Sequence, residues 1–204
     1  KENLKTEEEL QGYFVRRVES MLMQRGKKAI GWDEILEGGG ARSATVQSWR
    51  GMEGAVTAAL AGHDAIVSPT THAYFDYDPK TLDLETVYNF EPAPADLPPD
   101  KSHHILGGEC NMWSERAPQP FIDRRVFPRL TAMAEVLWSP RENRDFKGFQ
   151  ERLDSHYRRL DNLGVKYGKE STPVTIIPIF KTNPPGEKSV TIELADQKSQ
   201  VRYS

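Results

Sequence analysis

The chain has 204 residues, enough for one good-sized domain or for a domain plus part of another. Its 27 Lys and Arg residues and 30 Asp and Glu residues give a formal net charge of -3. This balance lacks the basic footprint of a nucleic-acid-binding protein. No apolar run in the sequence approaches the roughly 20 residues that a membrane-spanning helix needs. The single Cys110 excludes an internal disulfide.

The N-terminal residues predict that the chain is part of a longer protein. Residues 1–5 contain neither an initiator methionine nor the apolar core of a signal peptide, and they lead directly into a predicted helix. Any targeting signal is therefore expected upstream, and the residues themselves leave the compartment unknown.

Helices and short strands alternate along the first 168 residues. A helix is expected to begin with the capping box formed by Thr6 and Glu9 and to end at Gly26. Short apolar runs predict buried strands at 29–32, 44–49, 65–67 and 105–108. Helical spacing predicts further helices at 52–60, 121–138 and 146–163. Trp138 lies within one of these helical patterns and is expected to pack in the core.

This alternation favours βαβ units and a parallel sheet. Four such units make about half of a (β/α)₈ TIM barrel, which as a whole needs about 250 residues. A small open α/β sheet produces the same order of elements. The pattern of elements therefore predicts an α/β fold and leaves both architectures open.

Two segments depart from this alternation. Residues 70–104 are rich in proline, aromatic and acidic residues and are too long for an ordinary connection, which predicts a functional or disordered loop. Beyond Gly168, short strand-like runs appear at 174–177, 189–194 and 201–203. The predicted organisation is a half-barrel at 1–168 followed by the start of a small, sandwich-like β domain at 169–204.

Aromatic and acidic side chains occur where the predicted strands end. They are Trp32, Trp49, Tyr74, Asp76, Trp113 and Glu115. In a parallel α/β barrel the carboxyl ends of the strands carry the active site. Indole faces pack on sugar rings and carboxylates accept hydrogen bonds from hydroxyls, so the pattern favours a carbohydrate site. Taken singly, each tryptophan also fits core packing, and each carboxylate also fits a helix cap.

Five motifs at these positions resemble, in order, the signatures of glycoside hydrolase family 20, the β-N-acetylhexosaminidases. They are Gly31–Leu36, Ser48–Gly51, Tyr74–Tyr77, Asn111–Glu115 and Phe127–Arg129. The resemblance covers roughly residues 4 to 167 and implies the C-terminal half of the family's TIM barrel. It implies hydrolysis of terminal, non-reducing N-acetyl-β-hexosamine residues from an oligosaccharide or glycoconjugate, with no cofactor and no metal. It also implies a secreted, periplasmic or lysosomal protein.

The resemblance implies roles for individual side chains. The three tryptophans at the strand ends would enclose the N-acetyl group and the underside of the terminal sugar. Tyr74 would donate its hydroxyl to the acetamido carbonyl oxygen. Asp76 and Glu115 would accept hydrogen bonds from the outer hydroxyls. Arg50 and Arg129 match further family positions and are expected to be structural, paired with carboxylates.

Catalysis in family 20 is substrate-assisted and retaining, because the substrate's own acetamido oxygen attacks the anomeric carbon. An Asp orients the acetamido group, and an adjacent Glu acts as general acid and base. The family carries this pair in a His-x-Gly-x-Asp-Glu signature, which the sequence lacks. Asp33 and Glu34 align with the family's fifth strand instead, so they are expected to cap the following helix or to pair with Arg42 or Arg50.

The chain by itself is therefore predicted to be inactive. The alternative function is a non-catalytic carbohydrate-binding module that uses the same aromatic residues, since the binding residues are present without the acid pair. A half-barrel also exposes strand edges and apolar surface, which predicts possible self-association. No metal site is expected, because His103, His104, Glu109 and Cys110 fit no standard zinc pattern.

Overall fold

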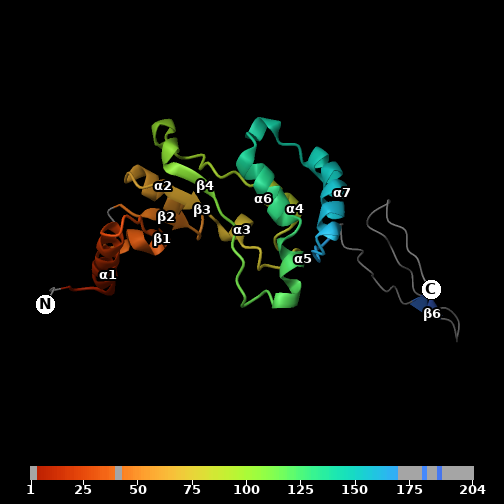
Figure 1. Ribbon diagram of the computed structural model, residues 1–204, viewed down its shortest axis with the longest axis horizontal. Coiled ribbons are helices and arrows are strands. Elements are labelled where there is room, and N and C mark those ends of the chain that lie inside the picture. The colour runs from red at the N-terminus through yellow and green to blue at the C-terminus, as the bar shows by residue number, and fades with distance from the viewer. Residues whose placement is uncertain (1–3, 40–42, 170–180, 183–187, 190–204) are drawn as a thin grey trace. The chain divides into compact units, whose positions relative to one another are not determined.

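The computed structural model describes residues 4–39, 43–169, 181–182 and 188–189 (Figure 1). The chain divides into two units, residues 1–168 and 169–204, and each unit is described by itself. In the second unit, β5 (Lys181–Thr182) and β6 (Lys188–Ser189) pair in antiparallel fashion. The strands predicted at 174–177 and 201–203, and most of the one at 189–194, lie outside the described residues.

A sheet of four parallel strands, in the order β1-β2-β3-β4, forms the centre of the first unit. The strands are β1 (Ile30–Trp32), β2 (Thr45–Ser48), β3 (Ala65–Val67) and β4 (Ile105–Gly108). All four match the short apolar runs of the sequence, and β2 is buried along its whole length. Such runs are typical of parallel strands that are covered on both faces. The predicted α/β class with a parallel sheet is confirmed.

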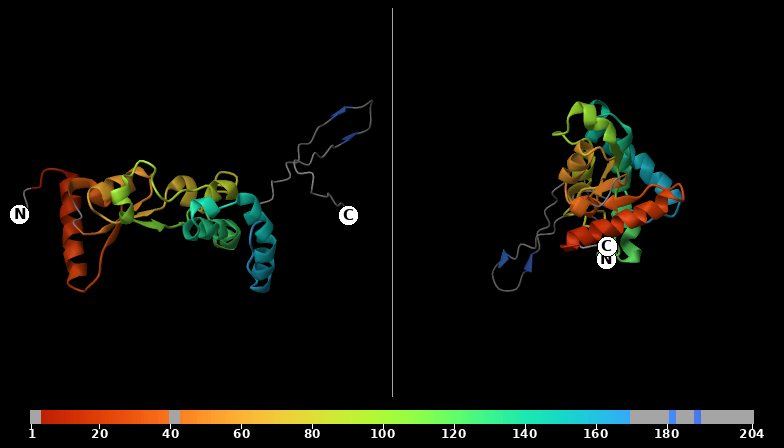
Figure 2. Two further views of the ribbon diagram at one scale, coloured as in Figure 1. Left: turned by 90° about the horizontal axis from the view of Figure 1, so that it is seen from above. Right: turned by 90° about the vertical axis from the view of Figure 1, so that its left-hand side faces the viewer.

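Helices connect and cover these strands (Figures 1 and 2). The α-helices are α1 (Glu7–Met23), α2 (Glu53–Leu60), α3 (Thr70–Ala73), α4 (Leu84–Tyr88), α5 (Ile122–Val126), α6 (Arg129–Trp138) and α7 (Phe146–Asn162). The 3₁₀ helices are η1 (Asp33–Gly39), η2 (Pro99–His104), η3 (Gln119–Phe121) and η4 (Arg141–Asn143). Helices α4 and α6 pack on each other, and one apolar core joins the sheet to α2, α4, α6 and α7.

Helix α1 begins at the predicted cap. The Thr6 hydroxyl accepts a hydrogen bond from the Glu9 main-chain N–H at 3.2 Å, as a capping box requires. The Glu9 carboxylate returns to the N–H of Lys5 at 2.7 Å rather than to that of Thr6. The reciprocal half of the box is therefore shifted by one residue, and both bonds satisfy amide groups at the helix start.

The apolar stripe of α1 faces solvent in this chain. Its exposed members are Leu10, Phe14, Val18 and Met21. The opposite side of the helix packs on η1, where a Cβ added to Gly12 would lie 2.5 Å from the Gly38 carbonyl oxygen. Glycine at position 12 therefore permits the close approach, while the residues with the strongest apolar periodicity remain uncovered by the described part of the chain.

The single helix predicted at 121–138 is wrong, because the structure has two helices there. Phe127 is extended (φ -103°, ψ 133°) between α5 and α6, and Pro128 follows it. A proline disfavours the helical region for the residue before it, which accounts for the break. Trp138, expected in the core, is 89% exposed at the end of α6. It lies about 200° around the helix from the buried Val136 and so faces solvent.

The segment 70–104 is also more ordered than its composition predicts. It contains α3, α4 and η2, and the Asp83 side chain caps α4 by accepting a hydrogen bond from Thr86 N–H at 2.8 Å. Its apolar residues enter the core; they include Phe75, Leu82, Leu84, Val87 and Phe90. The expected long loop is therefore part of the folded unit, because its apolar side chains are covered by distant helices.

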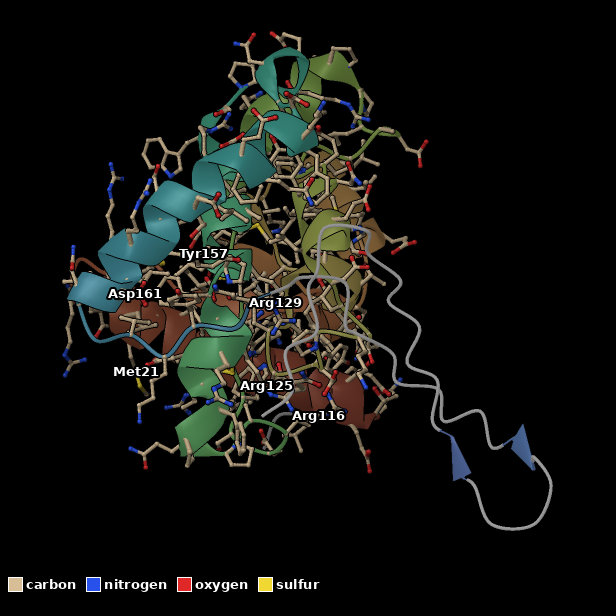
Figure 3. All side chains as sticks on the ribbon, turned by 90° about the vertical axis from the view of Figure 1, so that its right-hand side faces the viewer. Met21, Arg116, Arg125, Arg129, Tyr157 and Asp161 are labelled. Atoms are coloured by element: carbon tan, nitrogen blue, oxygen red, sulfur yellow. The ribbon has the colours of Figure 1, made fainter. Side chains whose placement is uncertain are left out.

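Arg129 is fully buried at the start of α6 and holds the segment that follows β3 (Figure 3). Its guanidinium group donates to the main-chain carbonyl oxygens of Phe75 at 2.7 Å, Leu82 at 2.9 Å and Tyr77 at 3.2 Å. Its Nε also donates to the Arg125 carbonyl oxygen at 2.8 Å. These bonds attach residues 75–82 to α6 and support the expected structural role of Arg129, but their acceptors are main-chain carbonyl oxygens, whereas carboxylate partners were expected.

Replacing Arg129 with methionine should destabilise the chain by about 3–5 kcal/mol, because several buried carbonyl oxygens lose their donor. The measurement is urea unfolding followed by far-ultraviolet circular dichroism. Arg158→Ala, which removes an exposed arginine of α7, is the matched control and should change stability by no more than about 0.5 kcal/mol. Equal stability of the two variants would contradict the structural role of Arg129.

Candidate functional site

Aromatic rings from the two outer strands of the sheet meet at its carboxyl edge. Trp32 is the last residue of β1, and Trp113 follows β4. Two strands separate β1 from β4, and neighbouring strands lie about 4.8 Å apart. The two indole rings are nevertheless only 6.1 Å apart between centroids. Side chains from the two outer strands therefore converge near the ends of the central strands.

A second aromatic pair comes from the central strands. Trp49 directly follows β2, and its ring centroid lies 6.4 Å from that of Tyr74, which follows β3. The Trp113 side chain also lies close enough to the Tyr74 hydroxyl to lower its pKa, which joins this pair to the first. We call Trp32, Trp49, Tyr74 and Trp113 the aromatic cluster. All four strands contribute to it, as expected from the positions of these residues in the sequence.

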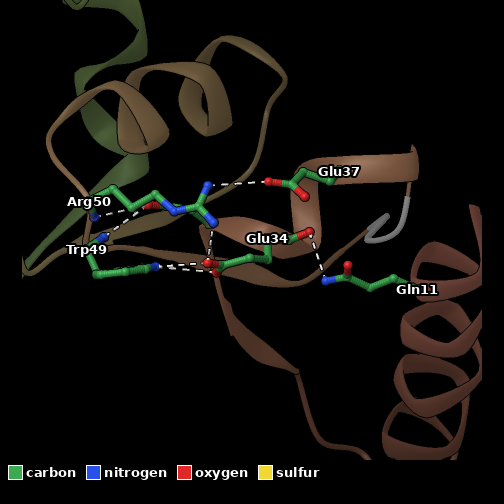
Figure 4. Close-up of polar contacts among 6 residues, drawn as sticks. Gln11, Glu34, Glu37, Trp49 and Arg50 are labelled. Atoms are coloured by element: carbon green, nitrogen blue, oxygen red, sulfur yellow. Dashed lines mark hydrogen bonds and ion pairs between the residues drawn. The ribbon is translucent and has the colours of Figure 1, made fainter. Parts of the chain in front are cut away.

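Polar contacts fix the orientation of Trp49 (Figure 4). The indole Nε1–H donates to Glu34, at 3.2 Å from Oε1. Arg50 also pairs with Glu34 at 2.6 Å and with Glu37 at 3.4 Å, and its guanidinium lies 5.5 Å from the centre of the Trp49 ring. The expected pairing of Glu34 with Arg50 is confirmed. The alternative partner, Arg42, lies outside the described residues.

Asp33 has a structural position beneath the same motif. Its Oδ2 accepts hydrogen bonds from the main-chain N–H groups of Trp49 at 3.1 Å and Arg50 at 3.3 Å. The side chain is buried and lies against α2, where a Cβ added to Gly54 would be 2.1 Å from Oδ1. Asp33 thus connects the end of β1 to the turn after β2 through Oδ2, while its buried Oδ1 has no hydrogen-bond partner among the described residues.

Tyr74 is buried at the centre of the aromatic cluster, with 7% of its surface exposed. Burial raises the pKa of its hydroxyl to about 12, and the nearby Tyr77, Asp76 and Asp33 raise it further, while the adjacent Trp113 side chain lowers it. A phenol with such a pKa keeps its proton throughout the neutral range. Tyr74 is therefore available as a hydrogen-bond donor beside the tryptophans.

Asp76 and Glu115 occupy contrasting environments. Asp76 is 1% exposed, and its Oδ1 has no hydrogen-bond partner among the described residues. Its Oδ2 lies 3.5 Å from Nη1 of Arg116. Glu115 lies in the exposed loop after β4 and, within residues 4–39 and 43–169, forms no ion pair with the other candidate residues. The structure therefore places Asp76 close to Tyr74, two residues away in the chain, whereas Glu115 is exposed in the loop after β4.

Sequence reasoning assigned no individual role to Asn111, which joins the ends of β3 and β4. Its main-chain oxygen accepts from Phe75 N–H at 2.8 Å, and its own N–H donates to the Ala73 carbonyl oxygen at 2.7 Å. Its buried Nδ2 has no hydrogen-bond partner among the described residues. The sequence feature that could have indicated a role for Asn111 is its position at the start of the Asn111–Glu115 motif. This motif follows β4, the strand next to the one that precedes Tyr74.

In the part of the chain that the structure describes, no three His, Cys, Asp or Glu side chains are grouped so as to hold a metal ion. None of the helices in these described residues has the length and apolar character that crossing a membrane requires.

The raised pKa of Tyr74 predicts a late ionisation in an alkaline titration. The folded chain holds this proton up to about pH 12, whereas the unfolded chain releases it near pH 10.0, so folding stability is retained below pH 10 and falls as the pH approaches 12. Tyrosinate absorbance measures the ionisation, and Tyr74→Phe should remove part of the late amplitude. Its contribution to stability is on the order of 2 kcal/mol. An unchanged late amplitude in the variant would contradict the assignment.

Sequence comparison matches residues 1–141 to the family described as glycosyl hydrolase family 20, catalytic domain. A beta-hexosaminidase of Porphyromonas gingivalis is 44% identical over 177 residues, which cover 80% of this chain and 23% of the relative. A beta-hexosaminidase of Vibrio furnissii is 34% identical over 143 residues, with 62% and 23% covered. The chain thus spans about a quarter of the length of these relatives. Their names give no support to a non-catalytic binding module.

Solved structures show the same similarity. An exo β-N-acetylglucosaminidase of Vibrio harveyi, in complex with N-acetylglucosamine, aligns with TM-score 0.72 and 35% identity over 79% of this chain and 28% of that protein. A chitobiase of Flavobacterium johnsoniae aligns with TM-score 0.70 and 36% identity over 80% of this chain and 26% of that protein. These matches confirm the predicted fold class, a partial TIM barrel, over the open-sheet alternative. The chain belongs to glycoside hydrolase family 20.

Proposed function

We propose that the chain is part of a β-N-acetylhexosaminidase that hydrolyses terminal, non-reducing N-acetyl-β-hexosamine residues of oligosaccharides or glycoconjugates. The observation that carries this proposal is the convergence of Trp32 and Trp113, at 6.1 Å, from the two outer strands of the sheet. Indole rings that converge over parallel strand ends offer flat apolar faces to a sugar and its acetyl group. Membership of family 20 and the complex of the Vibrio harveyi relative with N-acetylglucosamine support the same substrate class.

In this proposal the three tryptophans of the aromatic cluster enclose the N-acetyl group and the underside of the sugar. Tyr74 donates its hydroxyl to the acetamido carbonyl oxygen, a role supported by its burial and by its raised pKa. Asp76 accepts a hydrogen bond from an outer hydroxyl through its unpartnered Oδ1, and Glu115 does so from the exposed loop. The substrate thereby meets an apolar wall on one side and carboxylates on the other.

The proposed mechanism is substrate-assisted and retaining. The acetamido oxygen attacks the anomeric carbon, and the aromatic cluster favours this attack by holding the acetyl group beneath that carbon. The orienting Asp and the general acid Glu are supplied from outside this chain. Two observations support this placement: Asp33 binds main-chain amides, and Glu34 is engaged by Arg50 and Trp49. A Vibrio harveyi relative in which alanine replaces an aspartate is described as an inactive mutant.

The proposal also covers the organisation and location of the protein. Residues 1–168 supply the C-terminal half of the glycosidase barrel, and residues 169–204 begin a small β domain. The family resemblance supports a secreted, periplasmic or lysosomal location for the protein. Tryptic digestion that releases a stable product ending near residue 168 would support this boundary.

Hydrolysis of para-nitrophenyl N-acetyl-β-glucosaminide tests the activity. We expect turnover by the natural protein that carries this chain and essentially none by the 204-residue chain alone, because the acid pair is absent from it. In the natural protein, Tyr74→Phe and Asp76→Asn should each reduce kcat/KM by roughly 10- to 1,000-fold, as is usual for the loss of a positioned donor or acceptor.

The matched control is Arg158→Ala on α7, which should leave kcat/KM unchanged. Failure of the natural protein to hydrolyse any N-acetyl-β-hexosaminide would overturn the proposed function. If instead the isolated chain hydrolysed the substrate and Glu115→Ala abolished this activity, the placement of the catalytic pair outside the chain would be wrong. Asp33 and Glu34 would then become the candidates for the pair.

The isolated chain should self-associate or be only marginally stable. The outer edges of β1 and β4 have no neighbouring strand among the described residues, and the α1 stripe leaves Phe14 65% exposed and Leu10 56% exposed. Unpaired strand edges and exposed apolar patches both favour association. Sedimentation velocity at micromolar concentration measures this property. A single monomeric species with a cooperative thermal transition would contradict the prediction.

A further inference from the structure

Arg116 lies in the loop after β4, but it contacts residues that follow β3. Its Nη1 is 3.5 Å from Oδ2 of Asp76. Its guanidinium carbon is 4.7 Å from the centre of the Tyr77 ring, within the range of a cation–π contact. One side chain therefore links the two strand ends that carry Tyr74 and Trp113.

Asp76 is an unusual partner because it is almost completely buried. Its side chain is 2% exposed, whereas that of Arg116 is 61% exposed. Arg125 donates to the main-chain oxygen of Asp76 and leaves the carboxylate to other groups. Burial of an ionised carboxylate is costly unless donors surround it. Arg116 therefore supplies positive charge to this carboxylate from the solvent side.

The second carboxylate oxygen of Asp76 has no hydrogen-bond partner in the part of the chain that the structure describes. Oδ1 is buried and accepts no hydrogen bond from the described residues. A buried polar atom without a hydrogen-bond partner in a folded protein calls for an explanation. At the carboxyl end of a parallel strand, where barrel enzymes bind their ligands, a bound ligand is a suitable partner. A hydroxyl group is a suitable partner, since it donates a hydrogen bond to a carboxylate without adding charge.

We propose that Arg116 is a positioning residue that holds Asp76 by Oδ2 so that Oδ1 faces the outer hydroxyls of the bound sugar. The stacking of Arg116 on Tyr77 fixes the guanidinium, and the guanidinium fixes the rotamer of the carboxylate. Arg116 thereby acts on the substrate through Asp76. This inference rests on the proposed function, because it takes the partner of Oδ1 to be a hydroxyl of an N-acetylhexosamine.

A double-mutant cycle in the natural protein that carries this chain tests the inference. The variants are Arg116→Ala, Asp76→Ala and the double variant, assayed with para-nitrophenyl N-acetyl-β-glucosaminide. Arg116→Ala should reduce kcat/KM by roughly tenfold, mainly by raising KM. The double variant should be no worse than Asp76→Ala alone, because Arg116 has nothing to position once Asp76 is removed. Arg116→Lys, which keeps the positive charge, should recover part of the loss.

Several outcomes separate this inference from the proposed function. An inactive wild-type protein would overturn the proposed function and the inference with it. An active wild type with an unchanged Arg116→Ala variant, or fully additive losses in the double variant, would overturn the positioning role alone. Arg116→Gln, which keeps a polar side chain but is shorter and uncharged, takes the place of Arg116→Ala if that variant fails to fold. Arg158→Ala serves again as the exposed-arginine control.

Discussion

The buried guanidinium group of Arg129 is the interaction on which the arrangement of the site depends. Residues 75–82 follow β3 as an irregular segment, and their carbonyl oxygens cannot all be satisfied by a strand ladder. A buried carbonyl without a donor costs free energy. Arginine carries five N–H donors in a fixed planar arrangement, and Arg129 uses them on Phe75, Tyr77 and Leu82. Helix α6 therefore sets the path of the segment that carries Asp76.

The same segment is held at further points by groups from distant parts of the chain. Arg125 donates to the main-chain oxygen of Asp76, and Arg116 approaches its carboxylate. Asn111 fixes the adjacent main chain through Phe75. The candidate site thus depends on residues 111–129. These residues lie far along the sequence from β3, the strand that precedes the segment carrying Asp76. A substitution in α5 or α6 can consequently alter the site without contacting any ligand.

Much of the fold could be predicted because its strands are short apolar runs with clear ends, although only β2 is buried along its whole length and β1 and β4, expected to be buried, contain no buried residue. The errors have local and non-local causes. The helix at 121–138 was predicted as one piece because its apolar spacing continues across Pro128, although the proline acts directly on Phe127. Segment 70–104 resembled a loop because its short helices are stabilised by distant helices. Trp138 is expected in the core because it lies within a helical pattern, yet its position around the helix leaves it 89% exposed.

The members of the aromatic cluster could be predicted because the carboxyl ends of parallel strands share one edge of a sheet. Their partners could not, since the sequence left Glu34 equally able to meet Arg42 or Arg50. The observed partners determine what the cluster can do. Trp49 is held by Glu34 and contacts both Arg50 and Tyr74. A ring with these contacts loses its rotational freedom on folding rather than on binding. The proposed sugar contact would therefore not lose binding free energy to the ordering of this ring.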